Sequence, residues 1–366
     1  MSETKEHNFI VGIFGENYDQ NNLIGQALGA PGTRSDIQFY NRLDTTRKEV
    51  FCALTPIEYP EKIKPFLQTL AISDIHILVI DLNLGLTSVT GELLVGMDLY
   101  HQLYDSQDLV VITGIDAKNE WKLPDILKKV TAILNTTNLK GIDILTIRNK
   151  ENLEILKDKI SELKKNKPSL KGNSIEYSKT LIDHVFPVKG IGTVILGIVK
   201  KGEIHAGQML ELTGSESIGK KVIIRSIQKH DRNFKEANQG DRVGIALKGN
   251  ISPSDISRDD ILVNQGVFKP QKKIKANVFV NQYYIPKEGK IKPGDGIQYY
   301  GVVDLKLSPF KFTTGEELSP GKTGVATLDF SKNVYSDGTP IKGVITELNR
   351  FNGKLRIVGY FIQILD

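Results

Sequence analysis

The pattern of apolar residues changes near residue 166, and this change constrains the fold more than any other feature of the chain. Before it, near-continuous apolar runs lie at 9–14, 75–81 (IHILVID) and 109–113 (LVVIT). Such runs are typical of parallel strands that are buried on both faces. Amphipathic segments alternate with them and predict helices beginning at Leu23 and spanning 91–104, 123–134 and 152–163. The first part of the chain is therefore predicted to be a doubly wound α/β domain.

After this point the helical periodicity fades. Short apolar runs recur at intervals of about ten residues and are separated by glycine turns, which is the pattern of a small antiparallel β-barrel. They lie at 190–202, 221–228 and 241–249, and again at 275–284, 296–307, 321–330 and 353–365. A stretch rich in Pro, Gly, Ser and Lys at 166–174 reads as a linker. We expect three domains with the bounds 1–168, 174–268 and 270–366.

Composition excludes several classes of protein. Cys52 is the only cysteine, so neither an internal disulfide nor a cysteine metal cluster can form, and the residue is expected to be a small buried hydrophobe. The chain contains no apolar run of the roughly 20 residues needed to cross a bilayer. We expect a soluble, cytoplasmic monomer without metal or membrane partners. The net charge of +5 permits a polyanionic partner without requiring one.

One long segment carries a family resemblance. Residues 183–202 read DHVFPVKGIGTVILGIVKKG, and the likeness continues in register through 205–212, 225–228, 237–249 and 256–262. This resembles the start of the second domain of the EF-Tu class of translation elongation factors, and most closely the selenocysteine-specific SelB branch. The short length and the altered first domain resemble the archaeal SelB-like branch named EF-Pyl. The resemblance implies a P-loop GTPase-like α/β domain followed by two antiparallel β-barrels, with GTP hydrolysis as the family activity.

The resemblance also implies a tRNA-binding face on the first barrel. The family segment that matches Asp183, His184 and Phe186 lies beside the pocket for the aminoacyl end of tRNA, where an aromatic ring can stack on the terminal adenine. Alternatively, Phe186 belongs to the core and His184 is an ordinary surface residue. Arg242 either shares this face or is a structural ion-pair partner. Lys272 and Lys273 of the third domain are predicted to contact phosphates.

The nucleotide-binding loop departs from the family pattern. A working GTPase needs a glycine-rich loop ending in Gly-Lys-Thr, because backbone N–H groups and the Lys neutralise the phosphates while the Thr hydroxyl binds Mg²⁺. Residues 15–22 (GENYDQNN) contain no Lys, Ser or Thr, and they add the acidic Glu16 and Asp19. The residues that could still contact a nucleotide are Gly15, Gln20, Asn21, Asn22 and, after a later strand, Asp116.

The other nucleotide motifs are altered in parallel. The Asp-x-x-Gly-His motif falls on 55–59, where Thr55, Glu58 and Tyr59 replace the metal-linked acid, the glycine and the water-positioning histidine. Of the guanine-reading motif only Asp116 remains, and an acid after a strand can also be a cap. The Ser-Ala loop maps near Thr146 and Ile147. We therefore expect a degenerate GTPase-like domain with no catalytic residue, Tyr59 marking the degenerate position.

Three functions fit this sequence. The first is an elongation-factor-like protein that binds tRNA or aminoacyl-tRNA without a GTP cycle. The second is an active GTPase in which Asn21, Asn22 and backbone groups hold the nucleotide. The third is a ribosome-associated scaffold for protein interactions. No cofactor is expected under the first and third hypotheses, whereas GTP and Mg²⁺ belong to the second.

Overall fold

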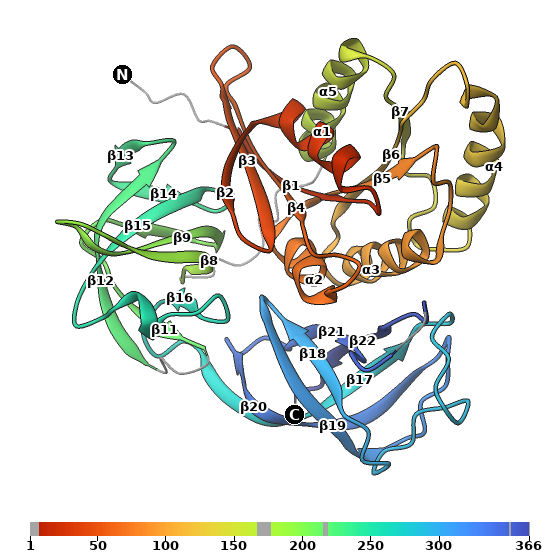
Figure 1. Ribbon diagram of the computed structural model, residues 1–366. Coiled ribbons are helices and arrows are strands. Elements are labelled where there is room, and N and C mark those ends of the chain that lie inside the picture. Colours follow the sequence, from red (N-terminus) through yellow and green to blue (C-terminus); the bar gives the residue numbers. More distant parts are fainter. Residues whose placement is uncertain (1–6, 167–176, 215–218, 351–352, 366) are drawn as a thin grey trace. The chain divides into compact units, whose positions relative to one another are not determined.

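The chain folds into two compact units, which are described separately. The computed structural model describes residues 7–166, 177–214, 219–350 and 353–365 (Figure 1). Unit 1 comprises Met1–Leu170 together with Leu348–Ile357, and unit 2 comprises Lys171–Glu347 together with Val358–Asp366. The predicted linker at 166–174 lies outside the described residues except for Asn166. No helix in the described part of the chain is long and apolar enough to span a membrane.

Unit 1 is built on a seven-stranded sheet in the order β2-β3-β4-β1-β5-β6-β7. Strands β4, β1, β5, β6 and β7 run parallel, whereas β2 and β3 pair antiparallel at one edge. The strands are β1 (His7–Phe14), β2 (Ala30–Arg34), β3 (Ile37–Asp44), β4 (Glu49–Pro56), β5 (Ile75–Asp81), β6 (Gln107–Thr113) and β7 (Ile144–Thr146). The central strands are buried along most of their length, as their apolar sequences predict.

Helices cover both faces of this sheet (Figure 1). On one face Ile13 of β1 packs with Ile24 of α1 and Leu156 of α5. On the other face the ring of Phe14 packs edge-on against the ring of Phe66 of α2. Gly96 of α3 leaves room for the Phe66 ring, because a Cβ at position 96 would lie 2.6 Å from that ring. The helices are α1 (Tyr18–Leu28), α2 (Ile63–Ile72), α3 (Ser88–Tyr104), η1 (Glu120–Lys122), α4 (Leu123–Leu134) and α5 (Lys150–Asn166).

Unit 2 begins with a closed barrel. Its strands follow the order β11-β16-β8-β9-β15-β12, and pairing of β11 with β12 closes the ring. Strand β13 pairs antiparallel with the end of β12, and β10 pairs with β14 in a separate two-stranded sheet. The elements are β8 (Lys179–Val188), β9 (Gly192–Lys201), β10 (Glu203–His205), β11 (Met209–Thr213), β12 (Lys220–Lys229), β13 (Arg232–Phe234), β14 (Glu236–Asn238), β15 (Arg242–Lys248), η2 (Pro253–Asp255) and β16 (Ile261–Val263).

A second closed barrel follows in the order β17-β20-β19-β18-β21-β22. Its strands are β17 (Lys269–Val280), β18 (Tyr299–Val303), β19 (Lys306–Gly315), β20 (Thr323–Ser336), β21 (Lys342–Thr346) and β22 (Ile357–Gln363). A run of aromatic rings, including Phe310, Phe330 and Phe361, fills its interior. The predicted fold class, a P-loop-like α/β domain followed by two antiparallel barrels, is confirmed.

Polar contacts connect the two barrels within unit 2. The Lys179 ammonium lies 2.5 Å from Asp304 Oδ1, and Tyr177 donates a hydrogen bond to Asp337. Lys306 is buried and donates to the carbonyl oxygens of Asn333 at 2.8 Å and Gly214 at 3.3 Å. Because a buried ammonium needs acceptors, these bonds favour one arrangement of the two barrels over others.

In unit 1, a buried carboxylate near the start of β6 binds a histidine of α3. His101 Nδ1 lies 2.8 Å from Asp108 Oδ2 and 3.0 Å from the carbonyl oxygen of Ser106. Both partners can only accept, so Nδ1 is protonated and donates. The bond to Asp108 raises the pKa of His101. A pKa that is higher in the folded state than in the unfolded state adds to the free energy of unfolding. This contribution is complete when the pH is below the unfolded-state pKa, and it is lost as the pH rises through the folded-state pKa.

We therefore expect His101→Gln to lower the free energy of unfolding more at about pH 6 than at about pH 9, since Gln cannot take up the proton. Urea denaturation of the wild type and the variant at both pH values measures the difference. An identical loss at the two pH values would contradict the assignment.

Candidate functional site

The turn between β1 and α1 stands where a GTPase carries its phosphate loop, and it is filled by the chain's own side chains. Only Gly15–Asn17 separates the strand from the helix. Asn17 caps α1 by accepting from the backbone N–H of Asp19, and its Nδ2 donates to Asp81 Oδ2 at 2.6 Å. Glu16 Oε2 accepts from Thr87 Oγ1 at 2.5 Å. The helix N-terminus is thus capped internally and has carboxylates beside it.

The remaining predicted nucleotide residues are also used within the fold. Asn21 is buried, and its Nδ2 donates to the carbonyl oxygen of Gly15 at 2.9 Å. A Cβ at Gly15 would lie 2.4 Å from Asn21 Oδ1, so only glycine fits there. Asn22 Oδ1 accepts from the hydroxyl of Tyr40 at 2.8 Å. Gln20 lies half-buried on the first turn of α1.

A network of hydrogen bonds joins the loops at the carboxyl ends of the parallel strands. Asp81 Oδ1 accepts from the backbone N–H and the side-chain amide of Asn83. The amides of Asn83 and Asn119 both donate to the carbonyl oxygen of Gly114, at 3.2 Å and 2.7 Å. The exposed Asp116 accepts from the N–H groups of residues 118 and 119. Asp116 therefore caps this turn, which is the structural alternative that the sequence left open.

Tyr59, which the sequence predicts to match the family's water-positioning histidine, is part of a buried ion-pair cluster in unit 1. Tyr59 is buried, and its hydroxyl donates to Glu92 Oε1 at 3.1 Å. Arg356, from the segment that joins unit 1, reaches the same carboxylate through Nε at 3.1 Å and Nη2 at 2.5 Å. Burial, followed by the charge of Glu92, raises the pKa of the Tyr59 hydroxyl. Tyr59 therefore stays neutral, and its one proton is directed at Glu92.

In unit 2 the structure brings three of the predicted tRNA-binding residues together. Asp183 Oδ1 accepts from His184 Nδ1 at 2.8 Å, and Arg242 donates to both carboxylate oxygens at 3.2 Å. Burial alone would raise the pKa of Asp183, but Arg242 and His184 hold it below the usual range. Asp183 is thus a buried anion that fixes its two neighbours, and Arg242 is a structural ion-pair partner.

The other predicted RNA-binding residues are accessible. Phe186, two positions after His184 on β8, is 36% exposed, so it is not a core residue. Lys272 and Lys273 are exposed on β17 in the second barrel of the same unit. The outer face of β17 also presents Lys275.

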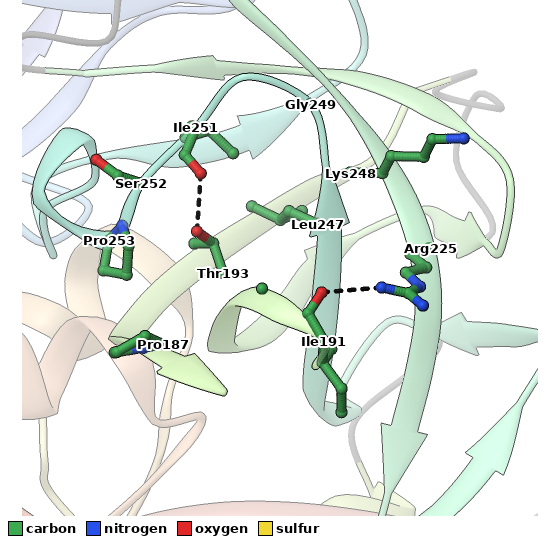
Figure 2. Close-up of a pocket in the computed structure, with 11 residues that line it drawn as sticks. Pro187, Ile191, Thr193, Arg225, Leu247, Lys248, Gly249, Ile251, Ser252 and Pro253 are labelled. Carbon is green, nitrogen blue, oxygen red and sulfur yellow. Dashed lines mark hydrogen bonds between the residues drawn. The ribbon is translucent and has the colours of Figure 1, made fainter. Parts of the chain in front are cut away.

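A pocket that the sequence did not predict lies in the first barrel of unit 2 (Figure 2). It has a volume of about 730 Å³ and is lined by the β8–β9 turn with the strand ends beside it, by the end of β15 and the loop that follows, and by one side chain of β12. Its cations are Arg225 and Lys248. The sequence shows Arg225 only as one polar residue in an alternating strand, so no local signal points to a pocket.

This chain is similar in sequence to several known proteins. Residues 192–258 match the family model for elongation factor Tu domain 2. The uncharacterised protein MJ0325 of Methanocaldococcus jannaschii is 30% identical over 288 residues, covering 79% of this chain and 81% of that protein. The selenocysteine-specific elongation factor of the same organism is 34% identical over 201 residues, covering 53% of this chain and 40% of that factor.

Solved structures share the fold over nearly the whole chain. Translation elongation factor SelB from Methanococcus maripaludis, in complex with the GTP analogue GppNHp, superposes with a TM-score of 0.81 at 23% identity, covering 99% of this chain and 80% of that one. A bacterial selenocysteine-specific elongation factor EF-Sec gives a TM-score of 0.79 at 17% identity, covering 98% of this chain and 58% of that one.

The cluster around Tyr59 gives a stability prediction. Arg356→Met leaves Glu92 buried without its cation, and the free energy of unfolding of unit 1 is expected to fall by about 3–5 kcal/mol. Tyr59→Phe removes one neutral donor and should cost only about 1 kcal/mol. The α-helices α1 to α5 all lie in unit 1, so the helical circular dichroism signal during urea unfolding follows this unit. Equal losses for the two variants would show that the ion pair adds nothing.

Proposed function

Because this chain belongs to the same family as MJ0325 and has the elongation-factor-like fold of the SelB/EF-Tu class, we propose that it binds tRNA or aminoacyl-tRNA and does so without hydrolysing GTP. The observation that carries the proposal is a contrast between the two units. The side chains of the phosphate-loop turn are used within unit 1, whereas unit 2 holds an ordered polar cluster beside an exposed aromatic ring.

The residues of unit 1 do not fit a Mg²⁺-nucleotide. The turn offers neither a lysine nor a hydroxyl, and its helix N-terminus is capped by Asn17. Glu16 and Asp81 would stand close to a phosphate and repel it. Thr55, at the position of the metal-linked acid, is fully buried. These features disfavour the active-GTPase alternative, and no step of the proposed function passes through GTP or Mg²⁺.

Unit 2 supplies groups suited to an RNA 3′ end. Phe186 presents a ring on which a base can stack, and His184 lies next to it in a conformation that Asp183 fixes. Because Asp183 holds both His184 and Arg242, these two side chains are ordered before a ligand arrives, which lowers the entropy cost of binding. Lys272 and Lys273 add cations for the phosphate backbone.

The amino acid on the bound tRNA and a role on the ribosome belong to the same proposal. The likeness to the EF-Pyl branch makes pyrrolysine the first amino acid to test. Sequencing the RNAs that co-purify with the full chain identifies the tRNA, and ribosomal RNA in the same fraction would support action on the ribosome.

The first test concerns the nucleotide. We expect no heat of binding when Mg²⁺-GTP or Mg²⁺-GDP is titrated into the protein, because the turn lacks the charge-assisted contacts that hold a triphosphate. Micromolar affinity would overturn this part of the proposal and restore the GTPase hypothesis.

The second test concerns the tRNA. Phe186→Ala should weaken tRNA binding at every salt concentration, by about 1–3 kcal/mol for one stacked base. Substituting Lys272 and Lys273 together by Ala should flatten the salt dependence. Filter binding at graded salt measures both effects.

Two control variants match these changes. Met209→Ala removes another exposed apolar side chain from the same barrel as Phe186. A double substitution of Lys322 and Lys342 by Ala matches the lysine pair in charge and exposure. If Phe186→Ala behaves like Met209→Ala while Lys272 and Lys273 are essential, the protein binds polyanions without a pocket for the 3′ end.

A further inference from the structure

At the amino edge of the sheet in unit 1, one buried carboxylate contacts two histidines. Asp108, the second residue of β6, lies 3.0 Å from His76 Nδ1 through Oδ1 and 2.8 Å from His101 Nδ1 through Oδ2. Ser106 Oγ donates to both oxygens of the same carboxylate, at 3.2 Å and 3.0 Å. Asp108 and His76 are buried, whereas the side chain of His101 is 30% exposed. The cluster therefore meets solvent at His101.

Both ring nitrogens of His76 face oxygens that can only accept a hydrogen bond. Nδ1 faces Asp108, and Nε2 lies 3.2 Å from the carbonyl oxygen of Leu70. Leu70 is in the last turn of α2, where the helix dipole favours a cation. A ring with two protons satisfies both oxygens, whereas a neutral ring turns one lone pair toward an acceptor. Because His76 is buried, loss of the second proton would leave a polar atom without a hydrogen bond.

His101 stands in the last turn of α3 and binds the same carboxylate from that helix. Burial alone would raise the pKa of Asp108, but the hydrogen bonds from His101 and His76 hold it below its usual range. The bond to Asp108 in turn raises the pKa of His101, so this ring keeps its proton above about pH 6.5, its ordinary value. When His101 loses that proton, a charge-assisted bond becomes a neutral bond of about half the strength.

Other polar and charged groups around the two rings are compatible with protonated histidines. Asp105, the C-cap residue of α3, places a second carboxylate near His101, and Asp98 on the same helix also interacts with the charge of His101. Tyr100 of α3 packs against the ring of His76 in T-shaped geometry, with the ring centroids 6.3 Å apart. Its hydroxyl donates to a backbone carbonyl of α2 at 3.2 Å, so it adds no charge beside the imidazole.

We propose that His76, His101 and Asp108 form a proton-dependent fastening that holds the C-terminal ends of α2 and α3 on the sheet and loosens as the pH rises. In the protonated state, two imidazolium rings join both helix ends to one carboxylate. As protons leave, the bond from His101 weakens and His76 gives up one of its two acceptors. The same helices adjoin the buried ion-pair cluster of unit 1, because Tyr59 precedes α2 and Glu92 lies in α3. The fastening is independent of the proposed tRNA binding.

Amide hydrogen exchange of the full chain tests this fastening, with rates converted to protection factors so that the intrinsic pH dependence of exchange cancels. In the wild type, protection at the ends of α2 and α3 should fall about tenfold between about pH 6 and about pH 9, because charge-assisted hydrogen bonds are weakened or lost. Helix α4 contributes no residue to the cluster, so its amides should change less and serve as the internal reference.

Two variants separate proton uptake from packing. His101→Gln offers an amide donor but takes up no proton, so the end of α3 should lose its pH dependence. The end of α2, which His76 still binds, should keep its pH dependence in this variant. Ser106→Ala is the matched control, because Ser106 also donates to Asp108 but does not titrate in this range. Ser106→Ala should lower protection by a similar factor at both pH values.

Four results would overturn the inference. The first is equal protection at both pH values for the helix ends of the wild type. The second is a wild-type pH dependence at the end of α3 in His101→Gln. The third is loss of the pH dependence in Ser106→Ala, which would show that any donor to Asp108 has the same effect. The fourth is an equal change in α4, which would assign the effect to global unfolding of unit 1.

Discussion

The hydrogen bond between Asn17 and Asp81 joins the turn after β1 to the end of β5, at the edge of the sheet where a P-loop GTPase has its nucleotide site. In a P-loop the N–H groups at the start of the helix point at phosphate oxygens. Here Asn17 caps that helix end with its own oxygen and directs its amide nitrogen to Asp81. Asp81 in turn positions Asn83, and Asn83 reaches Gly114 on the loop after β6. The loops after β1, β5 and β6 are therefore joined by side-chain hydrogen bonds.

The side chain of Tyr59 is also engaged within unit 1. A catalytic residue must present a polar group to a water molecule or a substrate, whereas Tyr59 directs its hydroxyl at Glu92 inside the unit. Loss of Tyr59 as a partner of Glu92 would destabilise unit 1 less than loss of Arg356, because a buried charge without a counter-charge lowers the free energy of unfolding far more than a missing hydroxyl does. The segment after β4 is thus held to α3 and to Arg356 by a buried cluster whose loss would cost stability.

Unit 2 uses a buried ion pair for a different purpose. Asp183 is almost inaccessible, so its charge acts on neighbours and not on solvent. By pairing with His184 and Arg242 it orders the strand that presents Phe186. The pocket beside the β8–β9 turn is ordered by the bonds from Thr193 and Arg225. Function in this class of folds depends on such sites and not on the fold itself, so the binding function of each unit has to be argued from its own side chains.

The sequence determined the fold class, because alternation of strands and helices and the later glycine-separated strands are local patterns. Strand β5 and helix α4 have the predicted bounds, whereas α1 begins at Tyr18, before its first apolar residues, because Asn17 caps it. The antiparallel β2–β3 edge was not predicted, since β2 is mostly exposed and has no apolar alternation. The sequence also indicated the altered phosphate loop and the segment around Asp183. Only the tertiary structure decided that Asp183 is buried, that Arg356 pairs with Glu92, and that Arg225 lines a pocket. These contacts join residues that are far apart along the chain, and local patterns do not encode which distant side chains meet.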